Sequence, residues 1–348
     1  GRRRGGAVGA MLRGMGAVIS RRSAPAAAAA RLSFSALDAP FAGVPEAQPS
    51  AAAGASYAST TLASGAAVAA HTVPGAGSST VTLTVEAGSM YETPETRGAA
   101  IMLKALAFKD TTERSALRLA RDLENAGATA SAGVSRTSLT YSVRCLPGDE
   151  ELAVSALSAT ALSPELLPWT VDEAAPSADF EVGQYASSPQ LQLSELLHAM
   201  AFGEDSPLGA NLFSPGAPAT VGAVVAHRAA TFTAGALTLS ASGAADLAAL
   251  ESLASCYLSA APAGPAAAAP AGGFVGGACK LRTGEPLAHV AVALPLGPGP
   301  TAEVLAELMS AMPGVTSAFT APYGGGLLGL YATGAGAVEA VAAALKTA

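Results

Sequence analysis

The sequence is poor in aromatic and charged side chains: of its 348 residues, 5% are Phe, Trp or Tyr and 13% are Asp, Glu, Lys or Arg. It holds three cysteines, Cys145, Cys256 and Cys279, and none belongs to a C-x-x-C pair. This scarcity argues against a disulfide scaffold and against a thiolate zinc site. Half of the residues are hydrophobic. No stretch of roughly 18 residues runs without charge, proline or a polar cluster, so a transmembrane helix is not expected.

Acidic residues are absent from the first 37 positions, which hold seven arginines. Of the 19 Lys and Arg residues, 12 lie beyond this segment and face 26 Asp and Glu residues, so the leader carries +7 and the body −14. This composition is typical of a mitochondrial transit peptide; a basic tail that binds phosphate or lipid is the alternative. We expect residues 1–37 to be a transit peptide and residues 38–56 a flexible linker. The acidic body argues against nucleic-acid binding.

Hydrophobic periodicity predicts alternating strands and helices over residues 57–259. Thr112 is a candidate cap for the second helix, and Ser188 followed by Pro189 is a candidate start for a later one. The acidic stretch between Pro164 and Ser188 shows no clear period and is expected to be irregular. In chain order we expect a strand at 79–86, helices at 101–108 and 116–123, strands at 128–135 and 138–145, and helices at 149–163, 189–200 and 221–232, then a strand at 236–240 and a helix at 247–257.

An Ala, Pro and Gly run over residues 260–273 is typical of an interdomain linker. Beyond it the order of elements recurs in shorter form, with a strand at 287–294, a helix at 301–312, a strand at 324–333 and a helix at 337–346. We therefore expect an α+β fold of two homologous units, each a mixed or antiparallel sheet packed with helices, over residues 57–259 and 274–348. The second unit is shortened, and its apolar faces are expected to need a partner surface.

Three blocks of residues, in this order, carry a family resemblance. They are Ala87-Gly88-Ser89-Met90-Tyr91-Glu92 with Leu106-Ala107-Phe108-Lys109-Asp110-Thr111, Leu123-Glu124-Asn125-Ala126-Gly127-Ala128 with Ser135-Arg136 and Tyr141 to Asp149, and Ser317-Ala318-Phe319 with Tyr323 and Gly326 to Tyr331. They resemble the mitochondrial processing peptidase and cytochrome bc1 core protein family, which has an inverzincin-type metallopeptidase fold.

The resemblance implies a zinc peptidase site that this sequence lacks. Active members hold zinc with H-x-x-E-H on a helix and a later glutamate, and the first glutamate acts as base. Those positions are here Ile101, Lys104 and Ala105, and Lys104 would place a cation where the metal sits. We therefore expect no catalytic residue, no metal and no cofactor. The four histidines stand singly and are expected to be hydrogen-bonded or surface residues: His71, His198, His227 and His289.

Within this family the pattern is nearest to the core 2 branch, on the evidence of Pro168 to Val171, Leu196 to Phe202 and Gly276 to His289. That likeness implies a non-catalytic subunit of complex III, peripheral on the matrix side of the mitochondrial inner membrane. Its partners would be a core-1 or β-type subunit, cytochrome b, cytochrome c1 and the Rieske subunit, with no nucleic acid.

Two alternatives stay open. The first is the non-catalytic α subunit of the processing peptidase, although its glycine-rich loop would fall at 313–316, which is only four residues long. The triple glycine at 324–326 lies after that point and is expected to form a tight turn. The second alternative is a scaffold subunit of another inner-membrane assembly, ATP synthase or complex I.

Overall fold

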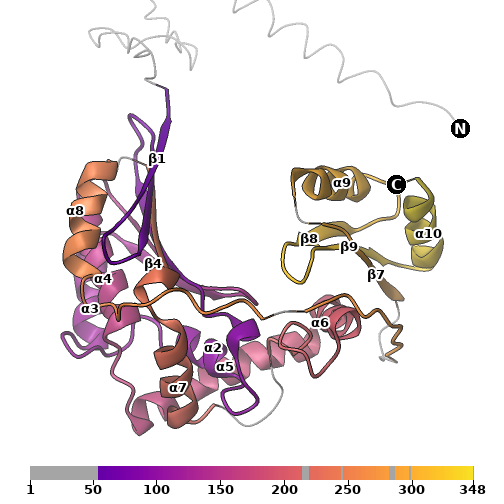
Figure 1. The fold of residues 1–348 in the computed structure, drawn as a ribbon, viewed down its shortest axis with the longest axis horizontal. Coiled ribbons are helices and arrows are strands. Elements are labelled where there is room, and N and C mark those ends of the chain that lie inside the picture. Colours follow the sequence, from indigo (N-terminus) through magenta and orange to yellow (C-terminus); the bar gives the residue numbers. More distant parts are fainter. Residues whose placement is uncertain are drawn as a thin grey trace, which may run out of the picture. The chain divides into compact units, whose positions relative to one another are not determined.

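A six-stranded mixed sheet forms the centre of the first unit in the computed structural model, which describes residues 54–213, 219–243, 246–270, 272–281, 287–297 and 299–347 (Figure 1). The strand order is β1-β2-β6-β3-β5-β4. Only β2 and β6 run parallel, and the other neighbours are antiparallel. The strands are β1 Ser56–Thr61, β2 Ala67–Thr72, β3 Ser79–Val85, β4 Thr129–Val134, β5 Leu139–Cys145 and β6 Leu237–Gly243.

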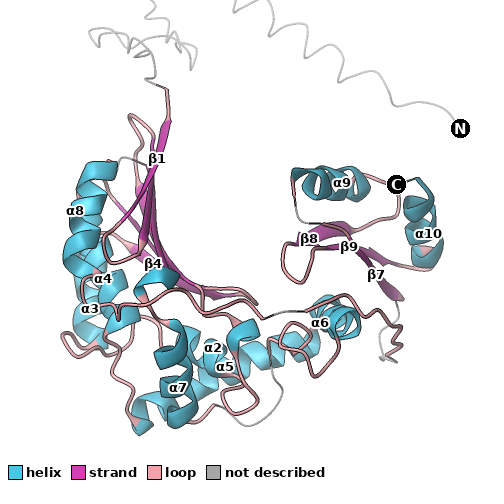
Figure 2. Cartoon of the chain, in the orientation of Figure 1, coloured by secondary structure: helices cyan, strands magenta, loops and turns pink. Residues whose placement is uncertain are grey.

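Alternation along β3 shows how the sheet is built. Val81, Leu83 and Val85 are fully buried, while the threonines between them are partly exposed. The buried face packs against α4 (Glu150–Leu162) and α8 (Leu247–Tyr257), which Figure 2 shows beside the strands. The predicted strands of this unit and the helix at 149–163 are confirmed, and burial alternates along β3, β5 and β6 as their sequence periods require.

A second group of helices lies beyond the sheet's main helical layer. It consists of α2 (Ala99–Ala105), α5 (Pro168–Ser187), α6 (Pro189–Phe202) and α7 (Val221–Thr231). Helix α2 packs between α5 and α7, and five of its seven residues are buried. Two short 3-10 turns complete the unit, η1 at Ser89–Tyr91 and η2 at Ala234–Ala236.

Two local predictions are wrong. Thr112 does not cap α3 (Ala116–Asn125): the Ser115 hydroxyl accepts from the Arg118 N–H, and Asp110 accepts from the Ala116 N–H, so the helix starts later. The acidic stretch after Pro164 is not irregular but forms the 20-residue helix α5. Its interior Pro176 is exposed, so the carbonyl that loses its helical partner can bond water instead.

The second unit repeats the first in its topology. Its strands β7 (His289–Pro295), β8 (Ser317–Ala321) and β9 (Leu327–Thr333) lie in the order β7-β9-β8, all antiparallel, with α9 (Pro300–Ser310) and α10 (Ala337–Thr347) packed on them. The first unit contains the same arrangement in β3-β5-β4, with helices again after the first and the third strand of the chain order. The predicted fold class, an α+β fold of two related units, is confirmed.

Three consecutive glycines form the tight turn between β8 and β9 in the second unit. Gly324, Gly325 and Gly326 all have positive φ, between 63° and 90°, and connect β8 to β9. This confirms the expected tight turn, because such φ values are strained for other residues.

Residues 260–273 lie against the first unit where they are described. The Ala234 N–H donates to the Pro262 carbonyl and the Gly235 N–H donates to the Gly264 carbonyl. A small cluster of buried side chains also joins α6 to the second unit, with Leu197 and Phe202 packing near Ala321 and Leu327. The predicted transit peptide and most of the 38–56 linker lie outside the described residues. Among the described helices none is long and apolar enough to cross a bilayer.

Candidate functional site

Helix α2 carries the positions where the resemblance places a metal site. It starts after Gly98, whose φ of 84° is left-handed. The partly buried Glu92 carboxylate accepts hydrogen bonds from the N–H groups of Gly98 (2.9 Å) and Ala100 (2.8 Å) at the start of the helix. Burial raises the pKa of Glu92 to about 6, although these two bonds and Arg97 act in the opposite direction. The Glu92 side chain therefore caps the first turn of α2.

The three motif positions hold no metal ligand. Ile101 is 4% exposed and packs in the main core, and Ala105 packs against the same core. The Lys104 ammonium makes an ion pair with Glu181 of α5, with 2.7 Å between Nζ and Oε1. Both side chains are about one-quarter exposed. The cation that the sequence places at position 104 is therefore paired with a carboxylate from another helix.

Glu181 was not singled out by the sequence, since it lies in the stretch expected to be irregular. The resemblance requires a glutamate later in the chain to complete the zinc shell, and Glu181 is a later glutamate that reaches this part of α2. An ammonium group therefore neutralises a carboxylate that could otherwise serve as a ligand. Among the described residues no group of three His, Cys, Asp or Glu side chains could hold a metal ion.

Each of the four histidines makes at least one hydrogen bond, and none lies at a motif position of α2. His71 Nδ1 lies 3.3 Å from the Ser242 hydroxyl, His227 Nε2 lies 3.1 Å from the Ala87 carbonyl, and His289 Nδ1 lies 2.8 Å from the Tyr331 hydroxyl. His227 is buried, and burial lowers its pKa. Each of these three hydrogen bonds joins a ring nitrogen to a hydroxyl or carbonyl oxygen.

His198 connects α6 to the second unit. Its Nδ1 is 2.7 Å from the Ser194 carbonyl and its Nε2 is 2.8 Å from the Tyr323 hydroxyl. A carbonyl can only accept, so Nδ1 carries the proton and the neutral ring accepts at Nε2 from Tyr323. Burial, and secondly Arg136, lower the pKa of His198 to about 4, with the Ser194 bond opposing them. The ring is therefore neutral at physiological pH.

A buried ion pair lies next to this histidine. Arg136 and Glu195 are 5% and 9% exposed, with 2.7 Å between Nη2 and Oε2. The same guanidinium donates to the carbonyls of Leu208 (3.1 Å) and Ala210 (2.6 Å), and Glu195 also accepts from the Leu212 N–H (2.7 Å). The pair thus fixes the β4–β5 turn, α6 and the loop after α6 to one another.

Close packing of the backbone explains why glycine stands at position 88, in the family block that lies against Arg136. A side chain at Gly88 would collide with the backbone carbonyl of Arg136, so the chain passes closely there only with glycine. The sequence singled out Gly88 and Arg136 through the resemblance, but it gave no sign of Glu195. The ion pair between Arg136 and Glu195 supports the fold at this point.

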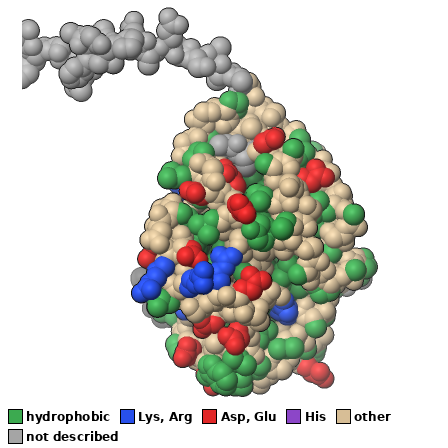
Figure 3. Space-filling model, turned by 90° about the vertical axis from the view of Figure 1, so that its left-hand side faces the viewer, with side chains coloured by type: hydrophobic (Ala, Val, Ile, Leu, Met, Phe, Trp, Pro, Cys, Tyr) green, Lys and Arg blue, Asp and Glu red, His purple; other side chains and the backbone are tan. Residues whose placement is uncertain are grey.

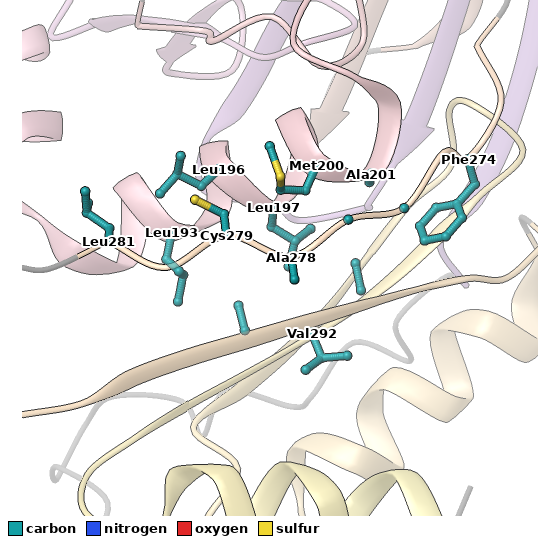
Figure 4. A pocket seen from close by; sticks show the side chains of 14 residues that line it. Leu193, Leu196, Leu197, Met200, Ala201, Phe274, Ala278, Cys279, Leu281 and Val292 are labelled. Atoms are coloured by element: carbon teal, nitrogen blue, oxygen red, sulfur yellow. The ribbon is translucent and has the colours of Figure 1, made fainter.

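An apolar cavity of about 270 Å³ lies beside β7. Figure 4 shows its lining from α6, from the segment that contains Phe274 and Cys279, and from the strand with Val292. Leu193, Leu196 and Met200 supply the α6 wall. Its lining side chains are aliphatic, aromatic or sulfur-bearing, and among these residues there is no carboxylate, imidazole or amine.

The face shown in Figure 3 carries acidic side chains dispersed among hydrophobic ones; most of the visible basic side chains lie in one small group, and others lie apart from it. A nucleic-acid interface needs a continuous basic surface, which this face lacks. The distribution agrees with the charge of −14 beyond the first 37 residues.

Comparison with known proteins gives a family and several relatives. Residues 67–216 match the insulinase family, peptidase family M16. The chain is 32% identical over 219 residues to the probable mitochondrial-processing peptidase subunit alpha-2, chloroplastic/mitochondrial, of Arabidopsis thaliana, across 62% of this chain and 43% of that protein. It is 35% identical over 128 residues to the cytochrome b-c1 complex subunit 2, mitochondrial, of Cryptococcus neoformans, across 36% of this chain and 29% of that protein.

A third relative is the mitochondrial-processing peptidase subunit beta of Caenorhabditis elegans, 30% identical over 141 residues, or 40% of this chain and 31% of that protein. The matched regions span less than half the length of these relatives. All three are mitochondrial by name, and each is a subunit. Residues 67–216 therefore carry a peptidase family M16 domain, and the chain is similar to subunits of the mitochondrial processing peptidase and of the cytochrome b-c1 complex.

Proposed function

We propose that the protein is a non-catalytic, core-2-like subunit of mitochondrial ubiquinol–cytochrome c reductase, complex III, where it supports assembly and stability. The observation that carries this proposal is the ion pair between Lys104 and Glu181. It lies where the resemblance implies a catalytic zinc ion.

The ion pair argues against peptidase chemistry on electrostatic grounds. A zinc site needs neutral imidazoles or carboxylates, and the hydrolytic water needs a general base. Ile101 and Ala105 have no donor atom, and the Lys104 ammonium cannot accept a proton or bind a cation. Glu181 is already neutralised by Lys104. The residues present therefore do not fit the zinc ion of active family members.

The relatives of this chain support a role as a permanent subunit of a larger assembly. The proteins that match this chain are subunits of two heteromeric mitochondrial assemblies, and one of the assemblies is complex III. Partners under this proposal are a core-1 or β-type subunit, cytochrome b, cytochrome c1 and the Rieske subunit. The site would be the matrix side of the inner membrane, which agrees with the arginine-rich leader.

A second candidate is the α subunit of the processing peptidase, favoured by one observation. Two α-type subunits of Arabidopsis thaliana match this chain over 62% and 67% of its length. Against it, residues 313–316 form only a short turn between α9 and β8, with the Val315 N–H donating to the Met312 carbonyl. That turn has no room for the long glycine-rich loop that handles presequences in the α subunit.

Native isolation separates the candidates. The full chain with a C-terminal affinity tag is isolated from mitochondria in mild detergent, and the assembly is resolved by native electrophoresis and mass spectrometry. Under the proposal it migrates with cytochromes b and c1 and shows their haem absorbance. Migration with ATP synthase or complex I subunits would instead support the other scaffold role. A tagged, unrelated matrix protein serves as the control for adventitious capture.

A cleavage assay tests the peptidase alternative directly. The purified chain is mixed with a β-type processing subunit and a fluorescent presequence peptide. Under the proposal the cleavage rate equals that of the β-type subunit alone. Stimulation would overturn the proposal in favour of the α subunit, since the β-type subunit supplies the zinc chemistry in that pair.

A further inference from the structure

The outward face of α5 exposes two aromatic side chains. Trp169 and Phe180 are 60% and 66% exposed and are separated by about three helical turns, so they lie on one face of the helix. Trp169 is the single tryptophan of the chain. The buried side chains of α5, among them Val171, Ala174 and Ala178, lie on the opposite face. Both rings therefore stand outside the contacts that α5 makes with α2 and α6.

Carboxylates flank the two rings. On the helix surface Asp172 and Asp179 lie on one side of the line between the rings, and Glu173 lies on the other side. All three are exposed, and among the described residues none of them has an ion-pair partner. The whole of α5 contains no Lys or Arg. The acidic charge of this face is therefore not compensated by its own helix.

A guanidinium group matches this combination of rings and acceptors. Arginine stacks on the face of an indole or phenyl ring while its N–H groups donate to a carboxylate beside the ring. The exposed Pro176 lies on the same face and has no N–H, so the Asp172 carbonyl one turn before it is a further free acceptor. The outward face of α5 thus fits a helix that carries arginine.

Helix α3 of this chain carries the complementary groups. Leu117 is 61% exposed, and the side chain of Arg118 is 72% exposed. Arg121 is exposed one turn after Leu117 on the same face. The first half of α3 therefore presents an apolar side chain beside two cations.

Three acidic residues near these arginines leave that character in place. Glu113 precedes the helix, and Asp122 and Glu124 lie in its second half. Asp122 is 4.0 Å from the Arg118 guanidinium, a weak contact at this exposure, and within the described ranges Arg121 has no ion-pair partner. The N-terminal end of the helix dipole adds positive potential to the first turn.

Helices α3 and α5 start side by side in the fold. The Thr112 N–H donates to the Ser163 carbonyl (3.0 Å), and the Glu165 N–H donates to the Asp110 carbonyl (2.9 Å). Each helix begins a few residues after this junction. Among the described residues no ion pair joins the two helices, so the basic and the acidic helix lie on neighbouring elements without neutralising each other.

We infer that two copies of this chain associate, with α5 of each copy against α3 of the other. Neighbouring surfaces of opposite charge on one molecule are self-complementary under a twofold rotation, which forms the contact twice and closes the assembly as a dimer. In each contact the arginines of α3 meet the carboxylates of α5, while Leu117 covers apolar surface of Trp169 and Phe180. The surface is small, so the dimer is weak, with a dissociation constant in the micromolar range.

Charge exchange between the two helices tests this association. One variant of the full chain carries Asp172→Arg with Asp179→Arg on α5, and a second carries Arg118→Glu with Arg121→Glu on α3. The matched control carries Glu204→Arg with Asp205→Arg, because these exposed carboxylates lie in the loop after α6. Sedimentation velocity measures the molar mass of each protein, and of the mixture of the first two variants, as a function of concentration.

The parent chain and the matched control are expected to form dimers with equal affinity. Each exchanged variant alone should associate at least tenfold more weakly, because both contacts then place like charges together. An equimolar mixture of the two variants should regain the parent affinity, since both contacts again join opposite charges. A monomeric parent chain, or a mixture that stays monomeric, would overturn the inference.

Fluorescence gives an independent readout, because Trp169 is the single tryptophan. Its emission should move to shorter wavelength as the parent chain or the mixture of variants associates, and should stay at the wavelength of an exposed indole in either variant alone. Emission of a buried indole in the monomer would show that residues of the same chain cover this face, and would overturn the inference.

This inference goes beyond the proposed function and does not depend on it. Dimers that form as described, in a chain that native isolation places outside complex III, would refute the proposed function and leave the contact between α3 and α5. Migration with cytochromes b and c1 by a chain whose mixed variants stay monomeric would do the reverse.

Discussion

Replacement of Arg136 by Met tests how strongly the buried ion pair supports the fold. Arg136 is 5% exposed and its partner Glu195 is 9% exposed, so water screens neither charge. Met keeps most of the aliphatic stem but removes the guanidinium. The substitution leaves the Glu195 carboxylate buried with one remaining donor, the Leu212 N–H.

The expected cost is about 4 kcal/mol of unfolding free energy. Removing one partner of a buried pair typically costs about 3–5 kcal/mol, because the other charge stays desolvated and uncompensated. The carbonyls of Leu208 and Ala210 also lose their donors, which places the value above the lower limit. The double variant Arg136→Met with Glu195→Met should recover about half of the loss, since no unpaired charge is then buried.

Urea unfolding followed by circular dichroism measures these free energies, and thermal unfolding gives a second value. About 4 kcal/mol corresponds to a fall of roughly 8 °C in Tm for a protein of this size. Arg118→Met is the matched control: Arg118 is 72% exposed and its nearest carboxylate oxygen is 4.0 Å away, so its loss should cost about 0.5 kcal/mol or less. Equal effects of the two substitutions would refute the reasoning.

Three further outcomes are expected. The contribution of His198 to stability falls by about 3 kcal/mol as the pH drops from 6.5 to 4, because this ring is protonated in the unfolded chain over this range but neutral when folded, with a pKa of about 4; the variant His198→Gln should lose this part of the pH dependence in urea titrations, and a slope equal to that of the parent chain would contradict the assignment. Lys104→Met should lower the unfolding free energy by about 1 kcal/mol or less, since the ion pair is partly exposed. The triple variant Ile101→His, Lys104→Glu, Ala105→His should bind one zinc ion in calorimetry while the parent chain binds none; failure of the variant would show that Glu181 is not placed as a ligand.

Periodic segments could be predicted because local pattern and tertiary role agree there. Val81, Leu83 and Val85 alternate with threonine, and the structure buries them on one face of β3. The same agreement made the repeat visible, since β7, α9 and α10 each follow their own period. The family blocks also pointed to positions with strict steric demands, such as Gly88 beside Arg136.

Helix α5 could not be predicted from its period. Its buried positions are Thr170, Val171, Ala174 and Ala178, so a threonine and two alanines stand where a larger apolar residue would mark the face. Its interior also holds Pro176, a residue that is unfavourable inside a helix. The helix forms because tertiary packing against α2 stabilises it, which intrinsic propensity does not report.

The replacement of the metal by an ion pair depends on that same unpredicted helix. The sequence indicated that Ile101, Lys104 and Ala105 have lost the zinc chemistry, but the partner of Lys104 lies 77 positions later on α5. Without zinc, a carboxylate at position 104 would lie beside Glu181, and two like charges a few ångströms apart cannot both stay ionised at low cost. A cation at 104 removes that conflict and joins α2 to α5. Under the proposed function, the Lys104 ammonium group takes the place that the resemblance gives to a metal ion, and its ion pair with Glu181 holds α2 and α5 together.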